Sequence, residues 1–414
     1  MRAEFIPPRP HPVVMALAQF ALPLFLPLHD QVTRIRLEPE ARERLNALGS
    51  GRALLVVNHP SETEPVVMFG VSRLVRQPFY FVATHEIFHG ARGWLVNHIG
   101  AFSIHRGRPD RTSLRMSRSL LAEQDRKLVI FPEGETHMEN DRILPLHPGA
   151  IQIGFWALET LEQLGQPLSL PVVPVTVRYC YQGDPVPALV RGLERLEADL
   201  GLGPMPGLTR SGRLIRAGLV VLAGIEREYA LPAPADPADL TEVDGRIAAV
   251  FRYGGGRVAE MLHVPFPDQE PVPVGLRILY NHTFDYQAGL AAGKSAYERR
   301  LHARRLLAAR ACLNDLDRLQ NFMVIGGRSL APPVRAERFG EVLWRLEREV
   351  VGRPRTRPLR EAVVRVGEPL RLEAQFPAYR ETRRKEVARC SQDIEARLRT
   401  QLEGMFSLGT PMPE

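Results

Sequence analysis

His59 and Glu64 are the two side chains of this sequence whose types and spacing best suit acid–base chemistry. The apolar run Ala53–Val57 predicts a short buried strand, and the Asn-His-Pro sequence that follows predicts its end in a turn. Because proline restricts the preceding residue to extended backbone angles, His59 is expected at a strand end. Ser61 or Thr63 can cap the helix that follows. The Glu64 carboxylate on the first turn of that helix can hold the imidazole in one tautomer and stabilise its protonated form.

This pair is not specific by itself, because a histidine near an acid is more often a turn residue or part of a surface ion pair. Three later stretches add chemistry. A strand ends at Arg106, whose guanidinium can hold a phosphate through two hydrogen bonds. Another ends at Glu133 in a Pro/Gly turn, where Gly134 lets a substrate approach the backbone closely. The apolar stretch Val172–Val175 suits an acyl-chain groove or the core.

Elements that position these residues alternate between strand and helix in the first half of the chain. Strands are predicted at 33–36, 53–57, 78–83, 100–104, 127–131 and 170–177, and helices at 39–48, after His59, at 91–98, 111–124 and 149–164. This alternation predicts an α/β fold with a mostly parallel sheet covered by helices on both faces. Functional groups gather beyond the carboxyl ends of the strands in such sheets, where His59, Arg106 and Glu133 fall.

The pattern becomes helical from about residue 183. Helices are predicted at 185–200, 209–229, 241–262, 294–320 and 335–349, with one strand-like run at Val272–Tyr280. A strand and turn return at Glu361–Pro369, followed by a helix at 380–403. We therefore divide the chain into an N-terminal segment at 1–50, a core at 51–182, a largely helical insertion at 183–360, and a returning strand with a C-terminal helix at 361–414.

Composition restricts the kind of partner. The 414 residues carry a formal net charge of +7, which suits an anionic membrane surface or a phosphorylated substrate. Nucleic acid is not expected, because no Lys/Arg run is interleaved with aromatic residues. Cys180, Cys312 and Cys390 are far apart in sequence and form neither a disulfide framework nor a metal-ligand pattern, so a reducing cytoplasm is predicted.

Residues 11–28 form an apolar run that Pro23 and Pro27 interrupt. A transmembrane helix needs roughly 20 apolar residues, so the run favours a helix or broken hairpin lying on a membrane surface. A helix packed on the core is the equal alternative. No secretory signal with a small-residue cleavage site is apparent, and we expect a cytoplasmic protein bound peripherally to the inner face of the membrane.

Together, the four stretches resemble the conserved blocks of the glycerolipid and lysophospholipid acyltransferases, in order and in spacing. Asn58, His59 and Glu64 match the first block, in which an acid follows histidine by five positions. The second block, Gly-x-x-x-x-x-Arg, matches Gly100 to Arg106, and the third, Phe-Pro-Glu-Gly, matches Phe131 to Gly134. The fourth, an apolar strand that carries proline, matches Val172–Val175. The resemblance covers roughly residues 50–180 and adds the Val-Gly-Glu-Pro sequence at 366–369.

This sequence departs from the family pattern at two places. The acid is Glu64 where the family usually has aspartate, and Glu62 is a competing acid at the wrong spacing. Glu135-Thr136-His137 follows Gly134 without the usual arginine, which leaves Arg106, Arg108 or Arg142 to bind any phosphate on the acceptor.

The resemblance implies transfer of a fatty acyl group from a thioester to a hydroxyl of glycerol phosphate, lysophosphatidate or a related lipid, in bacterial phospholipid biosynthesis. It implies His59 as general base, Glu64 as its support, Arg106 as acceptor ligand, and Glu133, Gly134, Ser61 and Asn58 as further substrate-binding residues. The donor would be acyl-CoA or acyl carrier protein, and no metal or organic cofactor is needed.

Two other classes of protein compete with this hypothesis. His59, Glu64 and several nearby histidines could ligate the metal of a hydrolase, although the spacing matches no helical zinc motif. The altered first and third blocks also fit a catalytically silent lipid-binding or scaffold protein. A serine hydrolase is disfavoured because the sequence has no Gly-x-Ser-x-Gly elbow.

Overall fold

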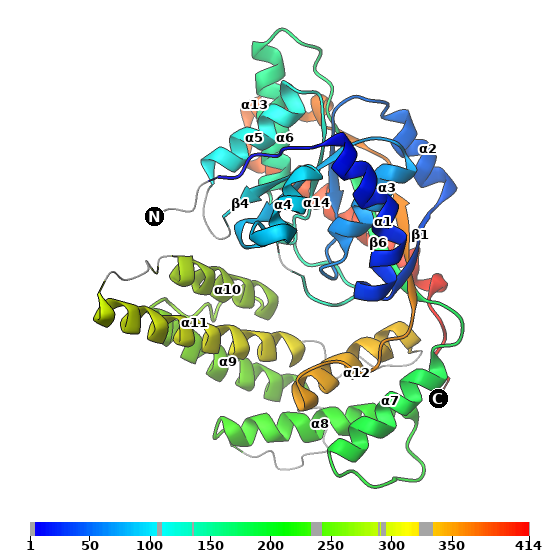
Figure 1. The fold of residues 1–414 in the computed structure, drawn as a ribbon, viewed down its shortest axis with the longest axis vertical. Helices are drawn as coiled ribbons and strands as arrows, with labels where there is room; N and C mark the ends of the chain where they lie inside the picture. Colours follow the sequence, from blue (N-terminus) through cyan, green and yellow to red (C-terminus); the bar gives the residue numbers. More distant parts are fainter. Residues whose placement is uncertain are drawn as a thin grey trace. The chain divides into compact units, whose positions relative to one another are not determined.

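The computed structural model describes residues 5–105, 110–134, 136–232, 242–288, 290, 295–322 and 334–413. The chain forms two compact units. The sheet unit consists of Glu4–Cys180 and Leu359–Leu408, and the helical unit of Tyr181–Pro358 with Gly409–Glu414. Figure 1 shows both units, coloured along the sequence.

One mixed, mostly parallel sheet forms the centre of the sheet unit, with strand order β1-β7-β6-β2-β5-β3-β4. The strands are β1 Val32–Leu37, β2 Ala53–Val57, β3 Phe79–Thr84, β4 Ala101–Ile104, β5 Lys127–Ile130, β6 Pro171–Tyr181, β7 Arg360–Val366 and β8 Leu370–Arg371. β2 pairs in parallel with β5 and β6, and the short β8 pairs antiparallel with β6. The predicted α/β fold with a mostly parallel, helix-flanked sheet is thus confirmed.

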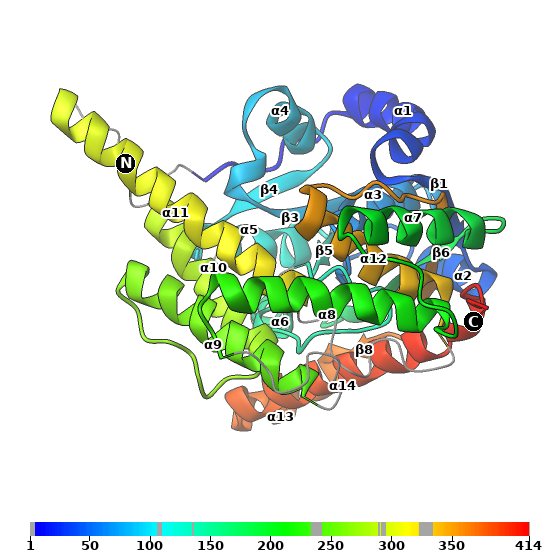
Figure 2. The same ribbon diagram turned by 90° about the horizontal axis from the view of Figure 1, so that it is seen from below.

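Side chains of β2 alternate between two apolar clusters, as the two-residue period of a strand requires. Leu54 and Val56 pack with α5 Arg111–Ala122, α6 Gly149–Gln163 and α14 Arg383–Glu403. Leu55 and Val57 pack with α1 Pro12–Asp30, α2 Pro39–Ala47 and α3 Glu64–Leu74. All five β2 residues are buried, which explains the uninterrupted apolar run. In Figure 2, α1 and α4 Gly90–His98 lie on one side of the sheet and α13 Phe376–Glu381 and α14 on the other.

Helices α7 to α12 build the helical unit around its own apolar core. They are α7 Val186–Asp199, α8 Arg210–Glu228, α9 Val243–Leu262, α10 Val272–Ala288, α11 Ala296–Phe322 and α12 Ala336–Val351. The strand predicted at Val272–Tyr280 is wrong, because this run is the first half of α10. Its buried side chains, Leu276, Leu279 and Tyr280, have helical spacing, and a run that short does not separate strand from helix by pattern.

β6 continues to Tyr181, four residues beyond the predicted end and well past Val57, where the neighbouring β2 stops. Beyond Val57, side-chain amides bind the β6 backbone in place of a neighbouring strand. Asn58 Nδ2 donates to the Val177 carbonyl at 3.0 Å, and Asn58 Oδ1 accepts the Val177 N–H at 2.7 Å. Asn140 makes the same two bonds to the backbone of Tyr179, at 2.5 and 2.7 Å. Buried backbone groups need such partners, so the two asparagines permit the longer strand.

Replacing Asn140 with leucine should destabilise the sheet unit, because it leaves the Tyr179 N–H and carbonyl unpaired in a buried place. A buried unpaired polar group costs about 1–3 kcal/mol. Urea unfolding followed by circular dichroism should show a lower midpoint for Asn140→Leu. Asn46→Leu, on the exposed surface of α2, serves as the control and should unfold like the parent chain. Equal midpoints for the two variants would contradict the role assigned to Asn140.

Candidate active site

The structure brings His59 and Glu64 together. His59 lies in the turn after β2, and Glu64 is the first residue of α3. His59 Nδ1 is 2.8 Å from Glu64 Oε2. The Glu64 side chain is fully buried, whereas 17% of the His59 side chain is exposed. Glu62, the competing acid, is exposed.

The carboxylate determines which nitrogen of His59 carries the proton. An ionised carboxylate only accepts hydrogen bonds, so Nδ1 donates its N–H to Glu64 and the lone pair of neutral His59 lies on Nε2. No hydrogen bond to Nε2 occurs within the part of the chain that the structure describes. The Phe131 ring stacks on the imidazole, with centroids 4.5 Å apart, and limits its rotation. The arrangement suits a base that removes a proton from a molecule bound at Nε2.

Four donors surround the Glu64 carboxylate. Oε2 accepts from His59 Nδ1 and from the Ser61 N–H at 2.9 Å, and Oε1 accepts from Ser61 Oγ at 2.6 Å and Tyr179 Oη at 2.5 Å. Thr63 occupies the N-cap position of α3, but its side chain makes no capping hydrogen bond. Its N–H instead donates to Ser61 Oγ. Ser61 is buried and binds this acid, while its predicted contact with substrate stays a prediction.

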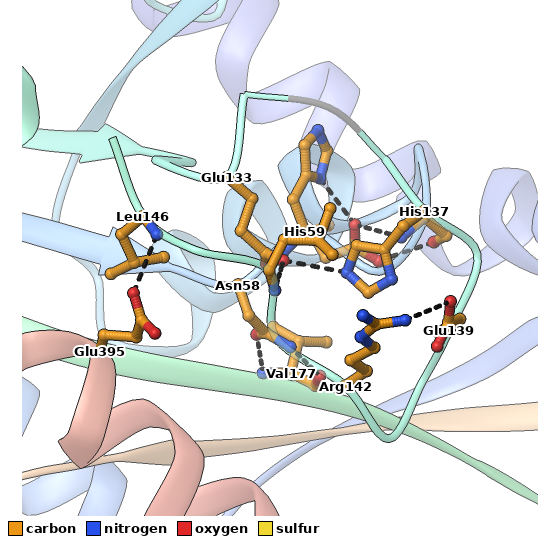
Figure 3. A network of polar contacts seen from close by, with 12 residues as sticks. Asn58, His59, Glu133, His137, Glu139, Arg142, Leu146, Val177 and Glu395 are labelled. Carbon is orange, nitrogen blue, oxygen red and sulfur yellow. Dashed lines mark hydrogen bonds and ion pairs between the residues drawn. The ribbon is translucent and has the colours of Figure 1, made fainter. Parts of the chain in front are cut away.

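Glu133 follows β5 and holds the backbone around His59. Its Oε1 accepts the His59 N–H at 2.6 Å, and its Oε2 accepts the Leu144 N–H at 2.7 Å. His137 Nε2 lies 2.9 Å from the same Oε2. Figure 3 shows the Glu133 side chain directed at the His59 backbone and the His137 ring. Glu133 is fully buried, so the structure gives it a supporting position, and its predicted contact with acceptor hydroxyls stays a prediction.

Gly134 and Asn58 occupy positions that their residue types explain. Gly134 is exposed with φ at +78°, in the left-handed region where a side chain is strained. Asn58 is fully buried, and both ends of its amide bind Val177 (Figure 3), which makes it part of the framework under His59. Direct substrate binding by either residue stays a prediction.

Arg106 and Arg108, two of the predicted phosphate ligands, lie outside the described residues, as does Glu135. The stretch before Arg106 is described: β4 ends at Ile104, and the His105 ring stacks on His85, which follows β3, at 5.0 Å. The described part of the chain thus ends at the carboxyl edge of the sheet, one residue before Arg106. Arg142, the third candidate, is 44% exposed and pairs with Glu139 at 3.5 Å.

Two residues of this framework carry no clear signal in the sequence. Tyr179 lies beyond the end of the predicted strand, and Asn140 lies in the loop between β5 and α6. Both act through contacts with residues distant in sequence, which periodicity does not reveal. Among the described residues, no group of three or more His, Cys, Asp or Glu side chains is arranged to hold a metal ion.

Comparisons with known proteins identify the class of this site. Residues 36–178 match the family model described as Acyltransferase. A stretch of 85 residues is 32% identical to the 1-acyl-sn-glycerol-3-phosphate acyltransferase of Streptococcus pneumoniae (strain ATCC BAA-255 / R6). It covers 20% of this chain and 31% of that relative. Residues 36–178 are thus similar to the acyltransferase family, and the predicted resemblance to the glycerolipid acyltransferases is confirmed.

Neutral His59 should carry its proton on Nδ1, and this can be checked without an activity assay. In histidine-labelled protein, ¹⁵N chemical shifts distinguish a protonated from an unprotonated ring nitrogen. We expect the Nδ1–H tautomer in the parent chain, and a mixture in Glu64→Gln because the amide can donate as well as accept. Predominance of the Nε2–H tautomer in the parent chain would refute the assigned hydrogen bond.

Proposed function

We propose that this protein transfers a fatty acyl group from a thioester to a hydroxyl of a glycerol-phosphate or lysophosphatidate-like acceptor, with His59 as general base. The observation that carries the proposal is the buried His59–Glu64 pair, with Nε2 left for substrate, inside the stretch that matches the acyltransferase family. The relative from Streptococcus pneumoniae is a 1-acyl-sn-glycerol-3-phosphate acyltransferase, and this supports a glycerolipid acceptor.

The chemistry follows from the two nitrogens of His59. Nε2 takes the proton of the acceptor hydroxyl as its oxygen attacks the thioester carbonyl carbon. Glu64 stabilises the imidazolium through the Nδ1–H bond. The tetrahedral oxyanion then collapses, the carbon–sulfur bond breaks, and the thiolate takes the proton back from Nε2. The products are an ester and a free thiol, and no cofactor enters this proposed sequence.

Arg106 is the proposed ligand of the acceptor phosphate, and acyl-CoA or acyl carrier protein is the proposed donor. In sequence, Arg106 comes two residues after the end of β4, and β4 ends at the carboxyl edge of the sheet, the edge where parallel sheets bind ligands. A guanidinium binds phosphate with two parallel hydrogen bonds. Arg142 offers a second, partly exposed cation after β5.

His59→Ala should reduce acyl transfer by about 10²–10⁴-fold, the usual contribution of a general base. The measurement is transfer of labelled acyl groups from acyl-CoA and from acyl carrier protein to glycerol phosphate and to lysophosphatidate. His263→Asn is the matched control, because His263 is an exposed residue in the helical unit and asparagine accepts its left-handed backbone.

Equal transfer rates in the parent chain and His59→Ala would reject His59 as the base. Absence of transfer from every donor, with lysolipid still bound, would favour the silent lipid-binding alternative.

We further propose that α1 rests on a membrane surface. Val13, Leu17, Phe20, Leu24 and Leu28 are 59–79% exposed and recur at helical spacing, so they form one stripe along the helix. We call these five residues the α1 stripe. Leu22 and Leu26, on the opposite face, pack into the sheet unit. α1 is thus one continuous helix that packs on the core with one face and exposes apolar side chains on the other. It therefore combines features of the two alternatives left open by the sequence, a helix packed on the core and a helix on a membrane surface.

Neighbouring features fit the same surface. α4 contacts α1 and adds exposed Trp94, at 55%, and the exposed cation Arg92. Tryptophan favours the membrane–water interface, and arginine attracts anionic lipid.

α1 tolerates its internal proline at position 23. Pro23 has no N–H to donate to the Gln19 carbonyl, and Arg73 Nη1 donates to that carbonyl instead, at 2.6 Å. By length and composition, α1 is long and apolar enough to cross a membrane, and only 11% of its most apolar stretch is buried inside the protein.

Phe20→Asp should weaken binding to phosphatidylglycerol/phosphatidylcholine vesicles. Phe20 is 79% exposed, so the change removes apolar area from the α1 stripe with little effect on the core. Burying such a side chain contributes about 1.5–3 kcal/mol, which corresponds to roughly a ten- to hundredfold weaker partition in sedimentation with vesicles. Met205→Asp, at a 54% exposed position of the helical unit, should bind like the parent chain. Unchanged partition of Phe20→Asp would contradict the proposed surface.

A further inference from the structure

We propose that Tyr179 is a positioning residue of this site. Its hydroxyl binds Oε1 of Glu64 and so fixes the carboxylate, whose Oε2 orients the His59 imidazole toward the acceptor hydroxyl. The inference rests on the proposed function and names a residue on which that function depends. Tyr179 lies on β6 and reaches the acid across 115 positions of sequence.

The hydrogen bonds divide the Glu64 carboxylate into two ends. Oε2 faces His59 Nδ1 and the Ser61 N–H, and Oε1 faces the hydroxyls of Tyr179 and Ser61. A carboxylate offers about four acceptor directions, so these four donors fill it. Any rotation of the carboxylate that moved Oε2 from His59 would also break the bond with Tyr179. Tyr179 therefore restrains the group that orients the imidazole.

This restraint is needed because the acid is glutamate. Compared with aspartate, which the resembling family usually has at this position, glutamate carries one more methylene and one more rotatable torsion. The longer side chain can place Oε2 at His59 in more than one way unless its other oxygen is fixed. Ser61 Oγ and Tyr179 Oη both hold Oε1, at 2.6 and 2.5 Å, and Tyr179 does so from a different strand than the one that leads to His59.

Asn140 and Arg360 hold Tyr179 in place. Asn140 binds both its N–H and its carbonyl. The Arg360 guanidinium lies 4.1 Å from its ring centroid, and Arg360 Nε donates to the Asp30 carbonyl at 3.1 Å. Only 3% of Tyr179 is exposed, and burial together with the Glu64 charge raises its pKa well above the usual value. The phenol therefore stays protonated across the working pH range and donates to the carboxylate.

Tyr179→Phe tests the proposal, because it removes the hydroxyl and keeps the ring under Arg360. We expect kcat to fall by about ten- to a hundredfold, as for other outer hydrogen bonds that orient a reacting group, with KM nearly unchanged.

Tyr379→Phe is the matched control. Tyr379 is also buried in the sheet unit, its hydroxyl accepts from Gln152 Nε2 at 3.1 Å, and its ring stacks on Phe155 at 4.1 Å. Both variants lose one buried phenolic hydroxyl, so both should lose some stability. Only Tyr179→Phe should change kcat. Equal effects of the two variants on kcat would overturn the proposal.

A double-variant cycle with Glu64→Asp shows whether Tyr179 acts through the acid. The shorter aspartate lacks the reach to bind both His59 and Tyr179, so Tyr179→Phe should add little to the loss caused by Glu64→Asp. Losses that multiply independently would overturn the proposal.

The tautomer measurement separates this proposal from the proposed function. In Tyr179→Phe, the Nε2–H tautomer of His59 should increase in the ¹⁵N spectrum, and in Tyr379→Phe it should not. This readout needs no turnover, so it supports or overturns the positioning role even if the parent chain transfers no acyl group. If the parent chain transfers no acyl group, that result counts against the proposed function and not against the positioning role of Tyr179.

Discussion

A carboxylate with no exposed surface at the start of α3 is the constraint around which the site is built. Burying an ionised group is costly unless hydrogen bonds replace its hydration. Glu64 meets this requirement through His59, through both the backbone and the hydroxyl of Ser61, and through Tyr179. These donors come from the turn after β2 and from β6, so the acid joins two neighbouring strands at their carboxyl ends.

The same edge is held by side chains where regular pairing stops. β2 ends at Val57, and from there Asn58 and Asn140 bind the backbone of β6 as a further strand would. Glu133 similarly binds the His59 N–H and the Leu144 N–H, which joins the turn after β2 to the loop after β5. A catalytic edge needs irregular backbone, and buried backbone groups there need side-chain partners. Several polar residues of the family-like blocks therefore serve the framework under His59.

The segment after the helical unit contributes to this edge as well. β7 pairs with β1, and Arg360 at its start lies over the Tyr179 ring. The sheet unit thus uses residues from both sides of a 178-residue stretch, Tyr181–Pro358, that folds around its own core. The match to the acyltransferase family covers residues 36–178 and does not extend to this strand, so part of the support for Tyr179 lies outside the matched domain.

The sequence by itself determined the strand–helix alternation, the parallel sheet and the residues at its carboxyl edge. Those features follow from local patterns: a buried strand is an apolar run, and His59-Pro60 must leave it in a turn. The resemblance also favoured Glu64 over Glu62, because Glu64 has the family's spacing from His59. The strand prediction at Val272–Tyr280 was wrong because the pattern of a short apolar run does not separate strand from helix. In the structure this run is helical and packs against α9 and α11.

Only the tertiary structure decided what each polar residue of the edge contacts. The resemblance implies that Glu133 and Asn58 bind substrate. In the structure, the Glu133 side chain binds the His59 N–H, 74 positions away in sequence, and the Asn58 side chain binds the backbone of Val177, 119 positions away. Tyr179 has no motif at all, because its importance comes from the distance between its hydroxyl and one oxygen of Glu64. Hydrogen bonds depend on direction and on tenths of an ångström, and only the packing of β6 beside β2 sets those quantities.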